Sequence, residues 1–260
     1  MQTTSTGEMP FLDHLEELRW RIIWSLVALV IGLVVGFVAV TKFGLIRLLQ
    51  EPIAPYLSGH KLVYTHPGDT FSIALNAALA VAIVIASPVI LYQAWAFLAP
   101  ALHRHEKRVV IPVIFGAIVL FILGVLMAYF LVLPMTLRFL MNFQEASLEP
   151  MITATDYFGF VMILALSFGG VFEMPILILG LAAMGLVTPQ FLSKFRRYAF
   201  LLSYVVAALI TPGDLLITTV ALTVPLYLLY EFSVFLAYLV FRKRQRAALA
   251  AEQRTLEGTA

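Results

Sequence analysis

The chain has 260 residues, of which 62% are hydrophobic and 12% charged, with a formal net charge of +2. Soluble domains are about half apolar and a quarter charged, so this composition indicates a protein of the lipid bilayer. The small net charge argues against nucleic-acid binding, and the absence of cysteine excludes disulfides, iron–sulfur clusters and thiol nucleophiles.

Six apolar runs predict six transmembrane helices, since about 20 mostly apolar residues are needed to cross the hydrocarbon layer. The predicted helices cover residues 22–41, 71–98, 109–133, 156–185, 198–211 and 215–240. Pro88 and Pro175 predict kinks in the second and fourth helices, and the third is expected to end near Pro134. The fold is therefore predicted to be a single all-α, polytopic membrane domain over residues 1–260.

Three other segments flank or connect these helices. Residues 11–21 predict an amphipathic helix at the membrane interface, because their apolar side chains form one stripe and their acids lie opposite. The loop 43–70 contains several prolines and a short amphipathic piece at 45–49, and is expected to form an ordered external cap. The tail 242–260 is polar and charged, and is expected to be either a solvated helix or disordered.

The fifth predicted helix is unusually short. Its 14 residues, 198–211, cover only about 21 Å at 1.5 Å per residue, which is less than the hydrocarbon thickness. The sixth helix reaches Glu231 after a similar length. A mismatch of this kind is met by local thinning of the bilayer, which we expect beside these two helices.

Lysine and arginine are distributed unequally between the two sides of the predicted bundle. Thirteen of the 17 lie before the first helix, after the last helix, or in the second and fourth connections. These residues concentrate on the cytoplasmic side of membrane proteins. Both termini are therefore predicted to be cytoplasmic, in agreement with the even number of spans.

Glu173 lies deep in the fourth run, about 20 Å from the cytoplasmic end of the predicted helix. A carboxylate at that depth is costly unless it is paired, hydrated or protonated, and such acids are commonly functional. The structural alternative is a protonated side chain that satisfies the carbonyl of Val171, which Pro175 leaves without its helical partner. A second functional interpretation is proton coupling in a secondary transporter of small solutes, although no convincing internal repeat supports it.

Glu17 and Glu106 are two carboxylates predicted on the cytoplasmic side of the membrane. Glu106 stands alone among the basic residues of 103–108, where it either binds a cation or only reduces repulsion between its neighbours. Glu17 follows two other acids within 13–16, so its own pattern is not specific. A pair of carboxylates suits a ligand with adjacent arginines, because carboxylates bind guanidinium groups through charge-assisted hydrogen bonds.

The sequence carries no pattern typical of an enzyme, a metal site or a nucleotide site. It has no H-E-x-x-H, G-x-S-x-G or Walker sequence, and its five histidines are scattered. We therefore predict no catalytic residue, metal or cofactor. Asp214 follows Thr-Pro-Gly and suits a helix N-cap. Gly32 and Gly36 form a G-x-x-x-G, a spacing that is common by chance.

Five motifs stand out along the chain. They are FLDHLEELR at 11–19, SPVILYQAWAFLAPAL at 87–102, HEKR at 105–108, FGGVFEMP at 168–175 and TPGD at 211–214. Together they closely resemble the TatC family, the receptor subunits of the twin-arginine protein translocase, over about residues 11–241. The resemblance implies a cupped bundle of six helices in the cytoplasmic (inner) membrane, with both ends cytoplasmic.

In that family, the positions that match Glu17 and Glu106 bind the twin-arginine signal peptide of folded cargo, and those that match Arg19 and Phe97 lie nearby. The resemblance thus implies a receptor that is not an enzyme, in a process driven by the proton-motive force. It also implies single-span partners similar to TatA and TatB beside the fifth helix of a homo-oligomeric complex, and no nucleic acid. The remaining alternative, a structural scaffold for other membrane subunits, predicts that substitutions of the two acids are silent.

The resemblance extends to polar residues elsewhere in the chain. Glu173 matches a family acid that faces the concave side, and Pro52 and Asp214 match external positions whose alteration disturbs transport. The sixth helix departs from the family pattern, because Thr218 stands where some members have glutamine. Together with Thr211, Thr218 is expected to keep this intramembrane site polar for a residue of a partner.

Overall fold

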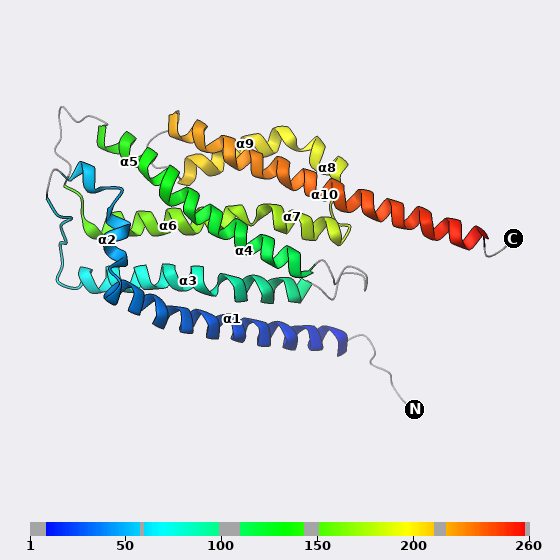
Figure 1. Cartoon of the computed structure of the whole chain (residues 1–260), viewed down its shortest axis with the longest axis horizontal. Helices are drawn as coiled ribbons and strands as arrows, with labels where there is room; N and C mark the ends of the chain where they lie inside the picture. The colour runs from blue at the N-terminus through cyan, green and yellow to red at the C-terminus, as the bar shows by residue number, and fades with distance from the viewer. Residues whose placement is uncertain (1–8, 58–59, 99–109, 143–150, 211–216, 258–260) are drawn as a thin grey trace. The chain divides into compact units, whose positions relative to one another are not determined.

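The structure, a computed structural model, describes five stretches of the chain: residues 9–57, 60–98, 110–142, 151–210 and 217–257. Within them the secondary structure is helical, apart from one isolated parallel bridge between Val63 and Thr153 (Figure 1). Among the described residues, five helical segments are long and apolar enough to cross a membrane. They are Leu15–Lys42, Asp69–Phe97, Pro112–Asn142, Ala154–Ala183 and Thr218–Arg242. The predicted all-α, multi-span fold is confirmed.

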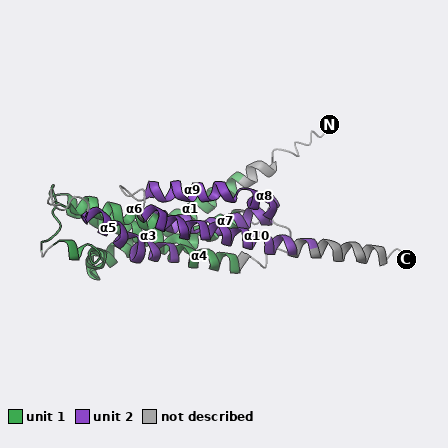
Figure 2. Ribbon diagram, turned by 90° about the horizontal axis from the view of Figure 1, so that it is seen from above, with its two compact units in different colours: residues 1–122, 148–166 green, residues 123–147, 167–260 purple. Residues whose placement is uncertain are grey.

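The chain divides into two compact units (Figure 2). The first, residues 1–122 and 148–166, contains α1 (Met9–Lys42), α2 (Leu45–Gln50), the 3-10 helix η1 (Ala54–Tyr56), α3 (Asp69–Leu98) and most of α4 (Val110–Met127) and α6 (Ala154–Phe172). The second, residues 123–147 and 167–260, contains the π-helical segment η4 (Ala128–Val132), α5 (Leu133–Asn142), α7 (Met174–Ala183), α8 (Pro189–Lys194), α9 (Arg196–Ile210) and α10 (Ile217–Glu257).

Helices α1 and α3 lie side by side in the first unit (Figure 1). A Cβ atom on Gly36 would lie 2.5 Å from the carbonyl oxygen of Ala78, and one on Gly32 would lie 2.8 Å from that of Ala82. Both distances are far inside van der Waals contact, so glycine is what permits the two backbones to approach this closely. The G-x-x-x-G sequence therefore packs one helix of the chain against another.

The segment between α1 and α3 is bonded to the start of α6. The hydroxyl of Tyr157 donates a hydrogen bond of 2.7 Å to the carbonyl oxygen of Leu49. The backbone N–H of Ala154 donates a bond of 2.6 Å to the carbonyl oxygen of Val63. The amphipathic piece predicted at 45–49 is helical, as α2, and these bonds order the described part of the loop around it.

The third span continues past Pro134, where the sequence predicts its end. Helix α4 passes into five π-helical residues, Ala128–Val132, and α5 then continues to Asn142. A proline ring clashes with the carbonyl four residues earlier, here that of Phe130, and the wider π-helical turn accommodates it. The helix is therefore longer than the predicted 109–133.

The fourth span is interrupted at Glu173, as Pro175 predicts. Helix α6 ends at Phe172, and α7 begins at Met174. At the interruption, the backbone N–H of Glu173 donates a bond of 3.1 Å to the carbonyl oxygen of Gly170. Pro175 occupies the second position of α7, where its missing N–H removes no hydrogen bond from that helix. The span therefore consists of two helices joined at one acidic residue.

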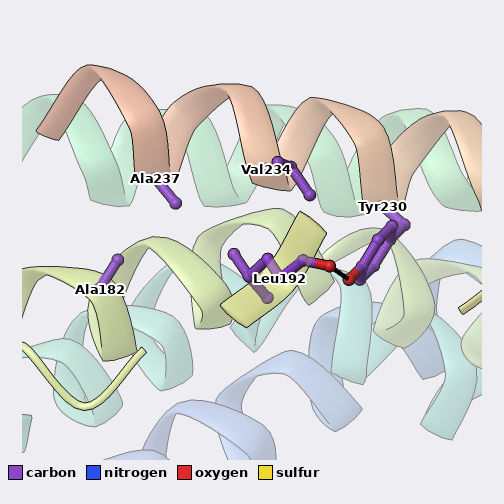
Figure 3. Packing of buried hydrophobic residues seen from close by; sticks show 5 residues of the cluster. All are labelled: Ala182, Leu192, Tyr230, Val234 and Ala237. Atoms are coloured by element: carbon purple, nitrogen blue, oxygen red, sulfur yellow. Dashed lines mark hydrogen bonds between the residues drawn. The ribbon is translucent and has the colours of Figure 1, made fainter. Parts of the chain in front are cut away.

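A core cluster in the second unit packs α7 and α8 against α10, as Figure 3 shows. Its buried members are Ala182, Leu192, Tyr230, Val234 and Ala237. The hydroxyl of Tyr230 donates a bond of 2.7 Å to the carbonyl oxygen of Leu192, so the polar atom of this buried ring is satisfied. Arg196 of α9 forms an ion pair of 3.0 Å with Glu231 of α10.

The last two helices differ greatly in length. Helix α9 has 15 residues, or about 22 Å. It is short, as expected, and it is not among the five segments long enough to cross a membrane, so the sixth span stays a prediction. Helix α10 has 41 residues and runs through the predicted polar tail to Glu257. Of the two states expected for that tail, the structure has the helical one in the described residues.

Candidate functional site

A groove of about 490 Å³ lies between α1 and α3 in the first unit. It is lined by Leu18, Arg21, Ile22, Ser25, Leu26, Leu29, Ile90, Gln93, Ala94 and Phe97. Most of these side chains are apolar, and the charged and amide groups come from the Arg21 and Gln93 positions. The groove thus offers an almost wholly apolar surface between the two helices, which suits an apolar stretch of a ligand.

The position of the groove follows from the residues that α1 and α3 place against each other. Leu18, Ile22 and Leu29 recur at helical spacing along one side of α1. Further along the same helix, Gly32 and Gly36 bring the two backbones into contact. The residues of α1 that line the groove come before residue 30, on the N-terminal side of these glycines.

Arg21, one of the lining residues, forms an ion pair with Glu17 and a hydrogen bond with Gln93. Arg21 donates to Glu17 Oε1 from Nε at 3.1 Å and also from Nη2. Its remaining nitrogen, Nη1, donates a bond of 3.3 Å to Oε1 of Gln93, which lies on α3. The side chains of Glu17 and Arg21 are 34% and 21% exposed, so the pair is partly shielded from water. Partial burial strengthens an ion pair relative to one in bulk water.

The structure brings two of the predicted site residues to this groove. Phe97 lines it, and Glu17 forms an ion pair with Arg21, which also lines it. Arg19 is exposed on α1 and does not line the groove. Glu106 lies outside the described residues, so its predicted role as the second carboxylate stays a prediction.

Arg21 and Gln93 are polar groups of the site that the sequence prediction missed. A signal for Arg21 was present, because it follows Glu17 by four residues, the spacing of neighbours on one helix face. Gln93 gave a weaker signal, as one of two amides within the apolar run 71–98. Its partner is 72 positions away in the sequence, and only the packing of α1 on α3 joins them.

Glu173 is a second candidate site, in the second unit. The residue is buried, with 8% of its surface exposed, and it lies inside the span Ala154–Ala183. Its Oε1 atom has no hydrogen-bond partner among the described residues. An acid in this situation is costly in a membrane, so the oxygen suits a proton, a water molecule or a polar group of a partner.

Buried hydroxyl groups gather at the beginning of α10. Thr218 is 2% exposed, and Thr219 and Thr223 are buried close to it in the sequence. The hydroxyl of Thr223 donates a bond of 2.8 Å to the carbonyl oxygen of Thr219. The polar character predicted at Thr218 therefore extends over two turns of the helix. Thr211 and Asp214 lie outside the described residues.

Two further predictions concern the rest of the described chain. Pro52 is half-buried in the turn that joins α2 to η1. In the part of the chain that the structure describes, no three His, Asp or Glu side chains form a group that could hold a metal ion.

Comparison with known proteins places this arrangement in a family. The family model described as "Sec-independent protein translocase protein (TatC)" matches residues 13–225. The Sec-independent protein translocase protein TatC of Aquifex aeolicus (strain VF5) is 42% identical over 239 residues, which cover 91% of this chain and 98% of that protein. The chain belongs to the TatC family.

Other members extend the match to a solved structure. The TatC protein of Escherichia coli (strain K12) is 35% identical over 229 residues, covering 87% of each chain. A crystal structure of the "Twin Arginine Translocase Receptor- TatC" superposes with a TM-score of 0.74 at 41% identity, covering 88% of this chain and 99% of that one. The relatives are named as components of a protein translocase, which is a transport role and not a catalytic one. This chain is a membrane protein of that family.

Proposed function

We propose that the chain is the receptor subunit of a twin-arginine protein translocase, and that it binds the twin-arginine signal peptides of folded cargo at the groove between α1 and α3. The observation that carries this proposal is the pair between Glu17 and Arg21, whose arginine lines an apolar groove. In this pair Glu17 already accepts the N–H groups of a guanidinium. The similarity to a crystal structure of a twin-arginine translocase receptor supports the same function.

Each part of the groove suits one part of such a peptide. Glu17 binds one arginine through charge-assisted hydrogen bonds, and we assign the second arginine to Glu106. The apolar residues that follow the arginines lie against Phe97 and the leucine and isoleucine side chains of the groove. Lysine lacks the planar arrangement of several donors that guanidinium has, so a twin-lysine peptide binds less tightly.

The surroundings of the receptor follow from its charge and its helix lengths. We assign it to the cytoplasmic (inner) membrane with both termini in the cytoplasm, because lysine and arginine concentrate on that side. Single-span partners similar to TatA and TatB pack beside α9, whose 15 residues favour a thinner bilayer. Transport of the cargo through a homo-oligomeric complex draws on the proton-motive force.

Polar residues away from the groove have roles in the same process. Glu173 and Thr218 are buried within the apolar spans, and we propose that they contact polar groups of the signal peptide or of a partner helix. Thr211 belongs to the same intramembrane set as Thr218. Pro52 and Asp214 act on the external side of the membrane.

The proposal is tested by binding of a labelled twin-arginine signal peptide to the purified chain in detergent, with a twin-lysine peptide for comparison. We expect tighter binding of the twin-arginine peptide, and a loss of about tenfold to a hundredfold in Glu17→Gln, from the energy of hydrogen bonds to charged groups. Glu16→Gln is the matched control, because Glu16 is the neighbouring acid and is exposed on α1. Equal binding of both peptides, or equal losses in both variants, contradicts the proposal.

One observation favours a second function, that of a proton-coupled transporter of small solutes. It is the buried Glu173 side chain, whose Oε1 has no partner among the described residues. Solute uptake driven by a proton gradient in liposomes that contain only this chain, and lost in Glu173→Gln, supports that function. Absence of such uptake, together with selective binding of the twin-arginine peptide, favours the receptor.

A further inference from the structure

We propose that Arg21 occupies the carboxylate of Glu17 in place of the ligand's arginine, so that a signal peptide binds only by displacing it. By competing for Glu17, Arg21 then lowers the apparent affinity of the receptor for signal peptides. This inference rests on the proposed function, since it concerns the same carboxylate. It differs in its consequence, because it predicts that removal of a positively charged side chain from the site strengthens binding.

The contacts of Arg21 are those expected of an incoming arginine. Two of its nitrogens, Nε and Nη2, donate to the same oxygen of Glu17. These are the donors through which a ligand guanidinium would also bind a carboxylate. A bidentate ligand arginine needs both carboxylate oxygens, and Arg21 already holds one of them, so the ligand must displace Arg21 to make its full set of bonds.

The helix keeps this competitor permanently beside its target. Glu17 and Arg21 are four residues apart on α1, so their side chains are neighbours on one helix face. Gln93 adds a fixed point on α3 by accepting the bond from Nη1 at 3.3 Å. When a ligand takes Glu17, the bond to Gln93 allows Arg21 to remain within the groove that it lines.

The extent to which Arg21 weakens peptide binding depends on the strength of its ion pair with Glu17. The apparent dissociation constant equals the intrinsic one divided by the fraction of molecules in which Glu17 is not held by Arg21. An exposed pair at this spacing is weak, but this one is partly shielded and has a third partner. We expect the internal pair to weaken peptide binding by about twofold to tenfold.

If the Glu17–Arg21 pair has only a structural role, its removal is not expected to raise peptide affinity. If the pair only stabilised α1, its removal would reduce helix stability and leave peptide affinity unchanged or lower. If Arg21 contacted the peptide directly, its loss would weaken binding. The sign of the change in affinity therefore separates displacement from both of these roles.

The experiment measures binding of labelled twin-arginine and twin-lysine peptides to the full-length chain in detergent, for the wild type, Arg21→Gln and Arg21→Lys. We expect Arg21→Gln to bind the twin-arginine peptide about twofold to tenfold more tightly, with an unchanged ratio between the two peptides, because competition affects both equally. Arg21→Lys keeps the positive charge but has a single donor nitrogen. We therefore do not expect it to bond to Glu17 and Gln93 at the same time, as the separate nitrogens of Arg21 do. Its affinity should lie between those of the wild type and Arg21→Gln.

The outcomes distinguish this inference from the proposed function. If the wild type prefers the twin-arginine peptide but Arg21→Gln binds it equally or more weakly, displacement is wrong and the receptor function stands. If Arg21→Gln binds more tightly but Arg21→Lys matches the wild type, the effect is one of net charge and displacement is also wrong. A wild type with no preference for arginine refutes the receptor function and this inference with it. Thermal unfolding of each variant verifies that the measured chain is folded.

Discussion

The contact between α1 and α3 gives a prediction whose size can be worked from the structure. In Gly36→Ala, the new Cβ atom would lie 2.5 Å from the carbonyl oxygen of Ala78 and 3.2 Å from the Cβ atom of Val81. Ordinary contact begins near 3.4 Å, so the two helices must separate by about 0.9 Å at this point. The obstructing oxygen belongs to a backbone and has no rotamer by which it can move away.

Overpacking of this kind costs about 1–3 kcal/mol, which is partly offset by the gain of up to about 1 kcal/mol when alanine replaces glycine in a helix. We therefore expect Gly36→Ala to lower the free energy of unfolding by about 1–2 kcal/mol. Gly32→Ala should cost less, because its Cβ atom would meet the oxygen of Ala82 at 2.8 Å.

The assay is thermal or denaturant unfolding of the purified chain in one detergent. Gly159→Ala is the control, because Gly159 lies within α6 and an added Cβ atom there has nothing within 4 Å. The control should be neutral or slightly stabilised through helix propensity. If Gly36→Ala unfolds like Gly159→Ala, the close approach of α1 to α3 is not a constraint on the fold and the argument fails.

Three other predictions concern the second unit. Tyr230→Phe removes the bond from the buried hydroxyl to Leu192 and should lower unfolding stability by about 1 kcal/mol, as measured by chemical denaturation in detergent. Arg196→Gln breaks an ion pair with Glu231 whose side chains are 50% and 30% exposed, so it should cost less than about 1 kcal/mol; a larger loss would contradict this. Glu173→Gln replaces a buried acid with a neutral amide, so thermal stability at neutral pH should be unchanged or higher. Export of a twin-arginine reporter should fall in the same variant. A large loss of stability would indicate a structural role for Glu173.

The spans were predictable from the sequence because crossing a bilayer imposes a length and a composition that few other structures share. The break at Glu173 was also predictable, because its cause lies nearby in the sequence. Pro175, two residues later, disfavours a continuous helix through the preceding turn. The third span was mispredicted at Pro134 for a related reason. A proline near the end of an apolar run predicts the end of the helix, but the π-helical segment Ala128–Val132 allows the helix to continue beyond Pro134.

The groove was less predictable, because its parts are far apart in the sequence. Glu17 and Phe97 were selected by resemblance to a family, and their own residue patterns gave little support. The bond from Arg21 to Gln93 joins residues 72 positions apart and exists only because α1 and α3 are packed together. The glycines that bring about this packing have a spacing that is common by chance. The spacing becomes informative only when the structure shows the backbones of Ala78 and Ala82 directly opposite these glycines.

The use of the glycines within the chain also limits how α1 takes part in a larger complex. A G-x-x-x-G face is a frequent site of contact between separate helices in membranes, but here the faces of Gly32 and Gly36 are covered by α3. The rest of the span is mostly uncovered, with large side chains such as Trp24 and Val34 exposed. A contact between copies of the chain through α1 must therefore use these bulkier side chains. Bulky side chains keep backbones further apart, so we expect such a contact to be weaker and easier to rearrange than the packing of α1 on α3.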